Sequence, residues 1–211
     1  GFQFWPASLL LNDYIIWKRE VLFPSSSRVV LELGCGVALP SIALATTIPD
    51  CLCIATDSSA VVLDNASHSA SLNTLASGSR FITRKLDWLH PTDLELFQQD
   101  LSNVSLVLAS DVIYGFKQSE SLVDLLSKLF TNIKSHQINV LLALERRVNF
   151  LVGDSSPQDH QATHFWTCLE SNHPEISLDK IKLYPSTDQQ FHPTWEMDTS
   201  SIELWLLSHK N

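Results

Sequence analysis

The chain has 211 residues, of which 45% are hydrophobic and 18% are charged. These proportions are typical of a folded globular protein and exclude a disordered, collagen-like or coiled-coil chain. Fourteen basic residues stand against 23 acidic residues, which gives a net charge of -9. Because no basic run is longer than a pair such as Arg146-Arg147, direct binding to nucleic acid is not expected.

Segments that would direct the chain to a membrane or out of the cell are not recognisable. No apolar run approaches the roughly 20 residues that span a bilayer, and the first residues lack the order of a signal peptide. We therefore expect an intracellular monomer, in the nucleus or the cytoplasm, that folds as a single domain over residues 1–211. Four cysteines favour reduced thiols over disulfides, because Cys51 and Cys53 would share one face of a strand.

Short apolar runs alternate with helical patterns along the chain. Strands are predicted over 28–33, 51–56, 80–85, 104–109 and 138–144, and helices over 38–46, from 58–59 to about 73, over 119–134 and over 161–171. A weaker helical pattern covers the polar stretch from 89 to about 99. Strands at 176–184 and 202–207 close the chain with no helix between them. This order predicts an α/β fold, a Rossmann-like doubly wound seven-stranded sheet that is mostly parallel and has an antiparallel terminal hairpin.

The segment ELGCGVAL, from Glu32 to Leu39, follows a predicted strand and opens a predicted helix. Glycines at 34 and 36 let the backbone approach a ligand, and a helix N-terminus offers free N–H donors. The nicotinamide pattern GxGxxG would need a small residue at position 39, where this chain has leucine. The segment therefore favours a GxGxG-type loop for an adenosyl cofactor over a dehydrogenase.

Further polar residues follow the later strands, where ligands of doubly wound sheets bind. Asp57 ends the second strand, where its carboxylate can accept both hydroxyls of a ribose. Asp87-Trp88 can present an aromatic face and a backbone donor to an adenine ring, or can plug the end of the sheet. Asp111 and Tyr114 form the substrate-side rim, although an aspartate there can also cap the next helix.

Taken in order along the chain, these motifs resemble the class I, seven-stranded S-adenosylmethionine-dependent methyltransferases. They most resemble the family-sixteen branch, which contains many protein-lysine methyltransferases. The resemblance rests on FWPAS at 4–8, LELGCG at 31–36, TD at 56–57, DW at 87–88 and SDVIY at 110–114. It implies S-adenosyl-L-methionine as cofactor and S-adenosyl-L-homocysteine as product.

The resemblance also implies a role for individual residues. Glu32, Gly34, Cys35 and Gly36 would line the methionine and ribose of the cofactor, Asp57 would hold the ribose hydroxyls, and Trp88 beside Asp87 would flank adenine. Trp5, in a covering segment over residues 1–24, would close over the cofactor, and Ser110 would line the pocket with its backbone. Asp111 and Tyr114 would hold the incoming lysine. The third glycine of the loop is Ala38 here, and its methyl group fits if the backbone is helical.

Three functions remain open from the sequence. The first is a protein-lysine N-methyltransferase acting on a non-histone protein, for which the acidic charge favours a basic partner. The second is methylation of a small molecule. Methylation of a nucleic-acid base is disfavoured, because enzymes that methylate base amino groups usually have a Pro-Pro-aromatic segment where this chain has Asp111 to Tyr114. The third is a non-catalytic scaffold.

Two further groups of residues have open roles. Glu145, Arg146 and Arg147 end the fifth strand, and they either shape a substrate channel through an internal Glu–Arg pair or form a structural salt bridge. His160 and His164 stand one helical turn apart, but no third ligand is evident. We therefore expect no metal site.

Overall fold

A computed structural model describes residues 3–23, 28–90, 92–93, 101, 103–132, 138–149, 156–183 and 200–210. Its strands are β1 (Arg28–Leu33), β2 (Cys51–Asp57), β3 (Arg80–Lys85), β4 (Val104–Ser110), β5 (Asn139–Glu145), β6 (Ile176–Lys180) and β7 (Ile202–His209). Its helices are α1 (Pro6–Trp17), α2 (Arg19–Leu22), α3 (Leu39–Thr47), α4 (Ala60–Ser71), α6 (Phe116–Asn132) and α7 (His160–Asn172). No helix within the described ranges is long and apolar enough to cross a membrane.

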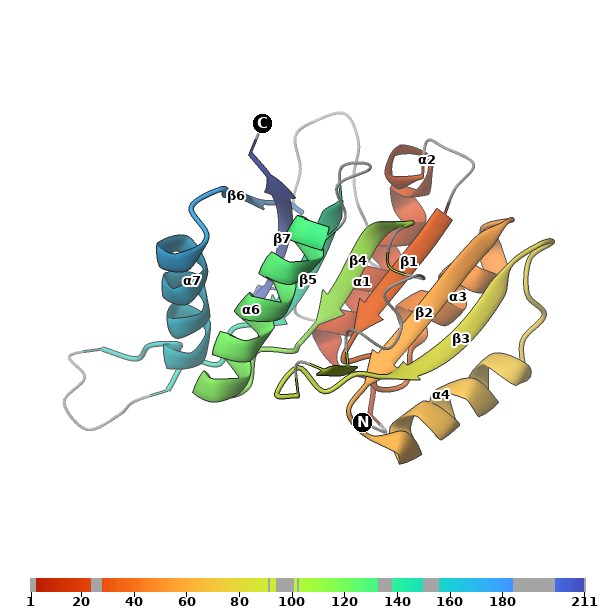
Figure 1. Cartoon of the computed structure of the whole chain (residues 1–211), viewed down its shortest axis with the longest axis horizontal. Helices are drawn as coiled ribbons and strands as arrows, with labels where there is room; N and C mark the ends of the chain where they lie inside the picture. The colour runs from red at the N-terminus through yellow and green to blue at the C-terminus, as the bar shows by residue number, and fades with distance from the viewer. Residues whose placement is uncertain are drawn as a thin grey trace.

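The strands form one seven-stranded sheet in the order β3-β2-β1-β4-β5-β7-β6 (Figure 1). Neighbours from β3 to β5 are parallel, whereas β7 runs antiparallel to both β5 and β6. The predicted sheet class is therefore confirmed, including its antiparallel terminal hairpin. Because strand order reverses beside β1, the carboxyl ends of β1 and β4 flank the position where such sheets bind ligands.

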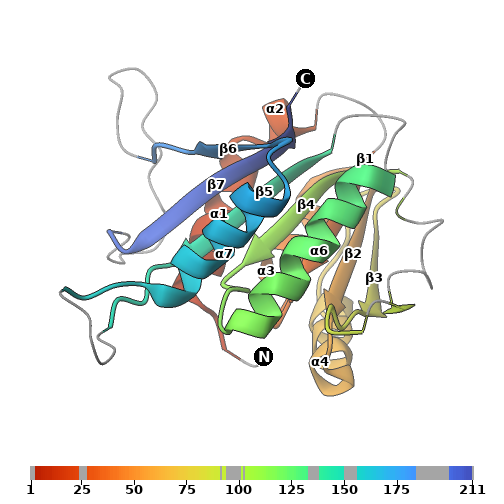
Figure 2. The same cartoon turned by 60° about the vertical axis from the view of Figure 1, so that its left-hand side comes forward.

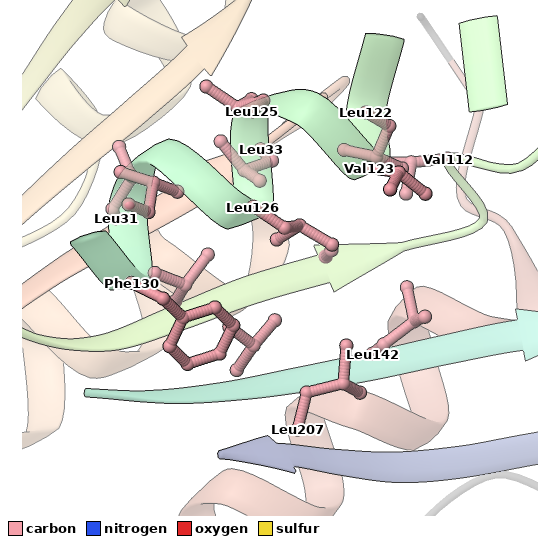
Figure 3. Close-up of a cluster of buried hydrophobic side chains, with 14 of the residues drawn as sticks. Leu31, Leu33, Val112, Leu122, Val123, Leu125, Leu126, Phe130, Leu142 and Leu207 are labelled. Atoms are coloured by element: carbon pink, nitrogen blue, oxygen red, sulfur yellow. The ribbon is translucent and has the colours of Figure 1, made fainter. Parts of the chain in front are cut away.

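Helices α6 and α7 cover one face of the sheet (Figure 2). The apolar face of α6 packs on side chains of β1, β5 and β7, as Figure 3 shows for Leu126, Leu31, Leu142 and Leu207. Each of these leucines is at most 1% exposed, and burial of such a side chain contributes about 1.5–3 kcal/mol. This cluster fixes the end of β4 and the loop that follows it.

Helices α1 and α3 cover the opposite face. Leu10 and Leu11 of α1 and Leu44 of α3 pack with the side chains of the central strands that point to this side, including Val30 of β1. Helix α4 packs on Ala55 and Phe81 at the β2–β3 side. The N-terminal helix α1 was not predicted from the sequence. Its buried positions share one face, but Leu9, Ile16 and Trp17 make the opposite face apolar too and obscure the pattern; Pro6 in its first turn was the available signal.

The remaining differences from the predicted elements concern their ends. Helix α6 begins at Phe116, three residues earlier than predicted, and β6 ends at Lys180 rather than at 184. Most of the weak helical pattern after Trp88 lies outside the described residues. Ser59 stands at the N-cap of α4 as expected, but its side chain makes no capping hydrogen bond.

Candidate active site

A groove lies beyond the carboxyl ends of β1, β2 and β4, beneath the start of α1. It encloses about 820 Å³ of empty space, the open mouth included, which is within the usual range for small-molecule sites. Its lining is Gln3, Trp5, Ser8, Gly34, Cys35, Gly36, Val37, Asp57, Ser58, Trp88, Ser110, Asp111, Val112, Tyr114 and Arg147. Nine of the eleven predicted site residues are in this set; Glu32 and Asp87 are not.

The loop after β1 is shaped by left-handed backbone conformations. Gly34 has φ +59° and Gly36 has φ +52°. A Cβ atom on Gly34 would lie 2.9 Å from a methyl group of Val112 and 3.3 Å from the ring of Trp88. Only glycine satisfies both the conformation and the space at position 34, so the first residue of the loop is fixed by its neighbours across the groove.

Ala38 departs from its expected conformation. Its φ of 56° and ψ of 33° are left-handed, not those of a right-handed helix, and α3 starts only at the next residue. The expectation that a helical backbone accommodates this methyl group is therefore wrong. A left-handed alanine costs roughly 1–2 kcal/mol, and the surrounding contacts of this fully buried residue must offset that cost.

Glu32 lies behind the loop instead of in the groove. Its side chain is buried, and Oε2 accepts a hydrogen bond of 3.1 Å from the backbone N–H of Ser41 in the first turn of α3. Burial raises the pKa of Glu32 to about 7, against the opposing effect of the hydrogen bonds from Ser41. The carboxyl group thus ties β1 to the start of α3 and supports the glycine loop from within.

Cys35 occupies the middle of the loop and lines the groove. Its backbone N–H donates to the carbonyl oxygen of Thr56 over 2.8 Å, which joins the loop to β2. Burial, with the nearby charges of Glu32 and Asp57, raises the pKa of the Cys35 thiol. The sulfur is therefore a neutral, weakly polar wall of the groove rather than a nucleophile.

Asp57 connects three elements with one carboxylate. Oδ2 accepts a hydrogen bond of 3.2 Å from the backbone N–H of Gly36, and Oδ1 accepts one of 3.0 Å from the N–H of Ser59. This second bond satisfies the backbone N–H of the N-cap residue of α4, whose own side chain makes no capping hydrogen bond. Each oxygen keeps acceptor capacity for a further donor, so the carboxylate can receive hydroxyl groups from a ligand in the groove.

The side chains of Trp88 and Asp87 have different surroundings although the two residues are adjacent in sequence. The ring of Trp88 borders the groove opposite Gly34. Asp87 instead accepts a hydrogen bond of 3.0 Å from the N–H of Leu89 and pairs with Nδ1 of His90 at 3.3 Å. Asp87 therefore shapes the turn that presents the tryptophan ring and does not face the groove.

Asp111 is held in an uncommon conformation at the end of β4. Its φ is 56°, and its backbone N–H donates to the carbonyl oxygen of Ala143 in the neighbouring β5. The side chain is 4% exposed and forms an ion pair with Arg147. Burial raises the pKa of Asp111, although the guanidinium group opposes the shift. The interpretation of this residue as a simple helix cap is not supported, because α6 begins five residues later.

Tyr114 stands on the rim of the groove, 49% exposed. Partial burial raises the pKa of its phenol, and the charges of Asp57 and Asp87 raise it further. The phenol is therefore neutral at physiological pH and can both donate and accept a hydrogen bond.

Arg147 also lines the groove, although the sequence left its role open beside Glu145 and Arg146. Besides its pair with Asp111, its guanidinium carbon lies 5.3 Å from the centre of the Trp5 ring, a cation–π contact. Arg146 pairs with Asp159 at 3.1 Å and with Glu203 at 3.3 Å. Within the described residues neither arginine pairs with Glu145, so the expected internal Glu–Arg pair is wrong. Strands β4 and β5 are parallel neighbours, so positions 111 and 147, which follow their carboxyl ends, lie side by side. This proximity follows from the strand order and from no local sequence pattern.

Comparison with known proteins adds family evidence to this geometry. A family model described as "Lysine methyltransferase" matches residues 1–171. Human methyltransferase-like protein 22 (Homo sapiens) is 28% identical over 185 residues, covering 81% of this chain and 44% of that protein. Mouse protein-lysine N-methyltransferase EEF2KMT (Mus musculus) is 30% identical over 140 residues, covering 61% and 39%. The chain therefore spans less than half the length of these relatives.

Solved structures support the fold independently. The methyltransferase domain of bacterial CtHen1 superposes with a TM-score of 0.59 at 13% identity, covering 95% of this chain and 97% of that one. A putative O-methyltransferase from Nostoc punctiforme gives a TM-score of 0.55 at 13% identity, covering 96% and 55%. At such identities the likeness concerns the fold alone. With the family model spanning most of the sequence and the methyltransferase fold present in the structure, the chain belongs to the lysine methyltransferase family.

Proposed function

We propose that this chain transfers a methyl group from S-adenosyl-L-methionine to the side-chain amine of a lysine in a protein. The observation that carries the proposal is the buried carboxylate of Asp111. It borders the same groove as the glycine loop and Asp57. A cofactor position and a position that attracts a cation are thus adjacent, in a chain of the lysine methyltransferase family.

The groove fits an adenosyl cofactor on the side of β1 and β2. Gly34 borders the groove, and its lack of a side chain lets Val112 and Trp88 pack close to the loop. The carboxylate of Asp57 is available to ribose hydroxyls. Cys35, Gly36 and the backbone of Ser110 would complete the walls. S-adenosyl-L-methionine supplies a methyl group on a positively charged sulfur, and the reaction then needs alignment of the acceptor nitrogen, with no covalent intermediate on the protein.

The residues 1–24 would serve as the cover of this cofactor position, as part of the same domain. Trp5 and Ser8 reach the groove from the start of α1. The ring of Trp5 is 43% exposed, so it can change position when a ligand enters. Its contact with Arg147 holds it over the carboxyl end of the sheet.

The acceptor amine would enter beside Asp111 and Tyr114. A lysine side chain is an ammonium ion at neutral pH, with an ordinary pKa near 10.4, and a buried carboxylate attracts it. Methyl transfer requires the neutral amine, and removal from water lowers the pKa of an ammonium group. The neutral phenol of Tyr114 can accept a hydrogen bond from the amine and orient its lone pair. The net charge of -9 favours a basic segment of the protein substrate.

The test begins with calorimetric titration of the purified chain with S-adenosyl-L-methionine and S-adenosyl-L-homocysteine. Incubation with cell lysate and radiolabelled cofactor follows, with unmodified protein and with Asp111→Ala. Binding of both compounds and a labelled protein band that contains methyl-lysine and disappears with the variant are expected. Label confined to small molecules would indicate the alternative substrate class. Failure to bind either compound would overturn the proposal and favour a scaffold.

A further inference from the structure

Three potential metal ligands meet on the outer surface of α6 and α7, outside the groove. Nε2 of His164 lies 3.0 Å from Oε1 of Glu120 and 3.6 Å from Sγ of Cys168. All three donor atoms lie within 4.8 Å of one another. His164 and Cys168 are one turn apart on α7, and Glu120 is on α6. The two helices lie side by side on the same face of the sheet (Figure 2).

The two separations that involve the imidazole nitrogen are close to those around a tetrahedral zinc ion. Zinc binds sulfur at about 2.3 Å, imidazole nitrogen at about 2.0–2.1 Å and carboxylate oxygen at about 2.0–2.2 Å. At tetrahedral angles these lengths separate the donor atoms by about 3.4–3.6 Å. The sulfur–nitrogen distance of 3.6 Å already has this value, and the oxygen–nitrogen distance of 3.0 Å needs only a small shift. The Glu120 side chain is 57% exposed and free to make that shift.

The arrangement is that of a coordination site and not of a catalytic relay. In a Cys–His–Glu relay the thiol and the carboxylate bond to opposite nitrogens of the imidazole ring. Here the sulfur of Cys168 and the oxygen of Glu120 both face Nε2 of His164. Three donors therefore converge on one point. The ring of Phe116 packs edge-on against the imidazole, with centres 5.0 Å apart, and holds its orientation.

We propose that Glu120, His164 and Cys168 bind one zinc ion that fastens α6 to α7. The three side chains supply a mixed oxygen, nitrogen and sulfur set that suits zinc better than magnesium or calcium. Water would take the fourth position, since His164 is 31% exposed. On binding, the thiol of Cys168 gives its proton to solvent and the sulfur coordinates as a thiolate.

The sequence predicted no metal site, because His160 and His164 alone offered too few ligands. His164 pairs with Cys168, one turn toward the C-terminus, and not with His160, one turn toward the N-terminus. The third ligand comes from a helix more than forty positions earlier in the chain, as the separation of 44 for Glu120 and His164 shows. Only the packing of α6 on α7 brings it into place.

The test uses the complete chain, and zinc and cobalt ions as probes. Competition with a chromophoric chelator measures zinc affinity for the unmodified protein, Cys168→Ser, His164→Gln, Glu120→Gln and the control His160→Gln. One bound equivalent is expected. Affinity should fall at least about tenfold, the loss typical of even an outer-shell partner, in the Cys168 and His164 variants, and remain unchanged in the control.

Absorption spectra of the cobalt-bound protein give a second readout. Thiolate-to-cobalt charge-transfer absorption together with intense visible bands of tetrahedral cobalt is expected in the unmodified protein and should be missing in Cys168→Ser. Binding that is equal in all variants, or cobalt absorption without a thiolate component, would overturn the proposal. So would failure of the unmodified protein to take zinc from the chelator. Because the site lies outside the groove, its failure would leave the proposed methyl transfer untouched.

Discussion

Replacing Asp111 with asparagine isolates the charge of the proposed lysine-binding residue. Asparagine keeps the size of the side chain and tolerates a left-handed backbone, so the φ of 56° adds no new strain. Alanine at the same position would combine loss of charge with backbone strain. The asparagine variant is therefore the sharper probe of what the carboxylate does.

The geometry at Asp111 sets the expected change in unfolding free energy and the expected change in kcat/KM for this variant. Removing one partner of a fully buried ion pair costs about 3–5 kcal/mol, whereas exposed pairs contribute about 0–1 kcal/mol. The carboxylate is 4% exposed and its pKa is raised by burial, so its charge is not a net source of stability, and Arg147 is 38% exposed and can return to water. The free energy of unfolding should therefore change by no more than about 1 kcal/mol. A hydrogen bond to a charged group contributes about 1.5–3 kcal/mol, so kcat/KM for methyl transfer should fall about 10- to 150-fold.

The assay compares initial rates of methyl transfer with calorimetric affinity for S-adenosyl-L-homocysteine. Cofactor affinity should stay within about twofold of the unmodified protein, because the proposal gives the carboxylate of Asp111 no contact with the cofactor. Asp64→Asn serves as the control, since it removes one negative charge from an exposed position on α4. Unchanged kcat/KM in Asp111→Asn would refute the assignment. Equal losses of cofactor affinity and turnover would assign the residue to cofactor binding instead.

Three other substitutions test the remainder of the site. Asp57→Ala removes the acceptor of two backbone N–H groups and of the proposed ribose hydroxyls, so calorimetry should show cofactor affinity about 10- to 100-fold weaker; unaltered affinity would contradict the role. Burial raises the pKa of Glu32 to about 7 from 4.5, so the stability this group contributes is lost as pH rises through that window. From about pH 5 to about pH 8 the unmodified protein should therefore lose about 2.5 kcal/mol more unfolding free energy than Glu32→Gln, as measured by urea denaturation; parallel profiles would contradict it. Gly34→Ala should lower the unfolding free energy by about 2–5 kcal/mol through left-handed strain and contact with Val112, and a stability equal to that of the unmodified protein would exclude the close packing.

The sequence was sufficient for those parts of the site that local patterns determine. Strands β1 and β2 are short β-branched runs buried on both faces, and each is followed at once by its functional group, the glycine loop or Asp57. In a parallel sheet such groups share one edge whatever the details of packing. The groove could therefore be predicted, and so could the presence of Trp88, Ser110 and Tyr114 along it.

Orientation could not be predicted in the same way. Asp87 and Trp88 are neighbours in sequence, yet hydrogen bonds to Leu89 and His90 turn the carboxylate away from the groove. Glu32 was expected among cofactor contacts because it stands beside the glycines. The alternation of a strand instead directs its side chain inward, toward the first turn of α3. Positions near a motif are thus assigned correctly, but the direction of each side chain depends on the turn that follows.

Contacts between distant elements were beyond sequence reasoning altogether. The pair of Asp111 and Arg147 depends on the register of β4 with β5, in which Ser110 stands opposite Ala143. The contact of Arg147 with Trp5 depends further on a helix, α1, that the hydrophobic pattern did not reveal. Neither relation has a local signature that a single sequence could display.

These two contacts connect the proposed substrate position to the proposed cover. The guanidinium group of Arg147 touches the carboxylate that would receive the substrate ammonium and the ring that would close over the cofactor. An ammonium ion that binds Asp111 competes with Arg147 for the same oxygens. Displacement of the guanidinium would also weaken its hold on Trp5, by about 0.5–1 kcal/mol for an exposed cation–π contact. Entry of the acceptor lysine and movement of the N-terminal segment are therefore coupled through one side chain, and Arg147→Lys, which keeps the charge but loses the planar fork, should alter both KM values together.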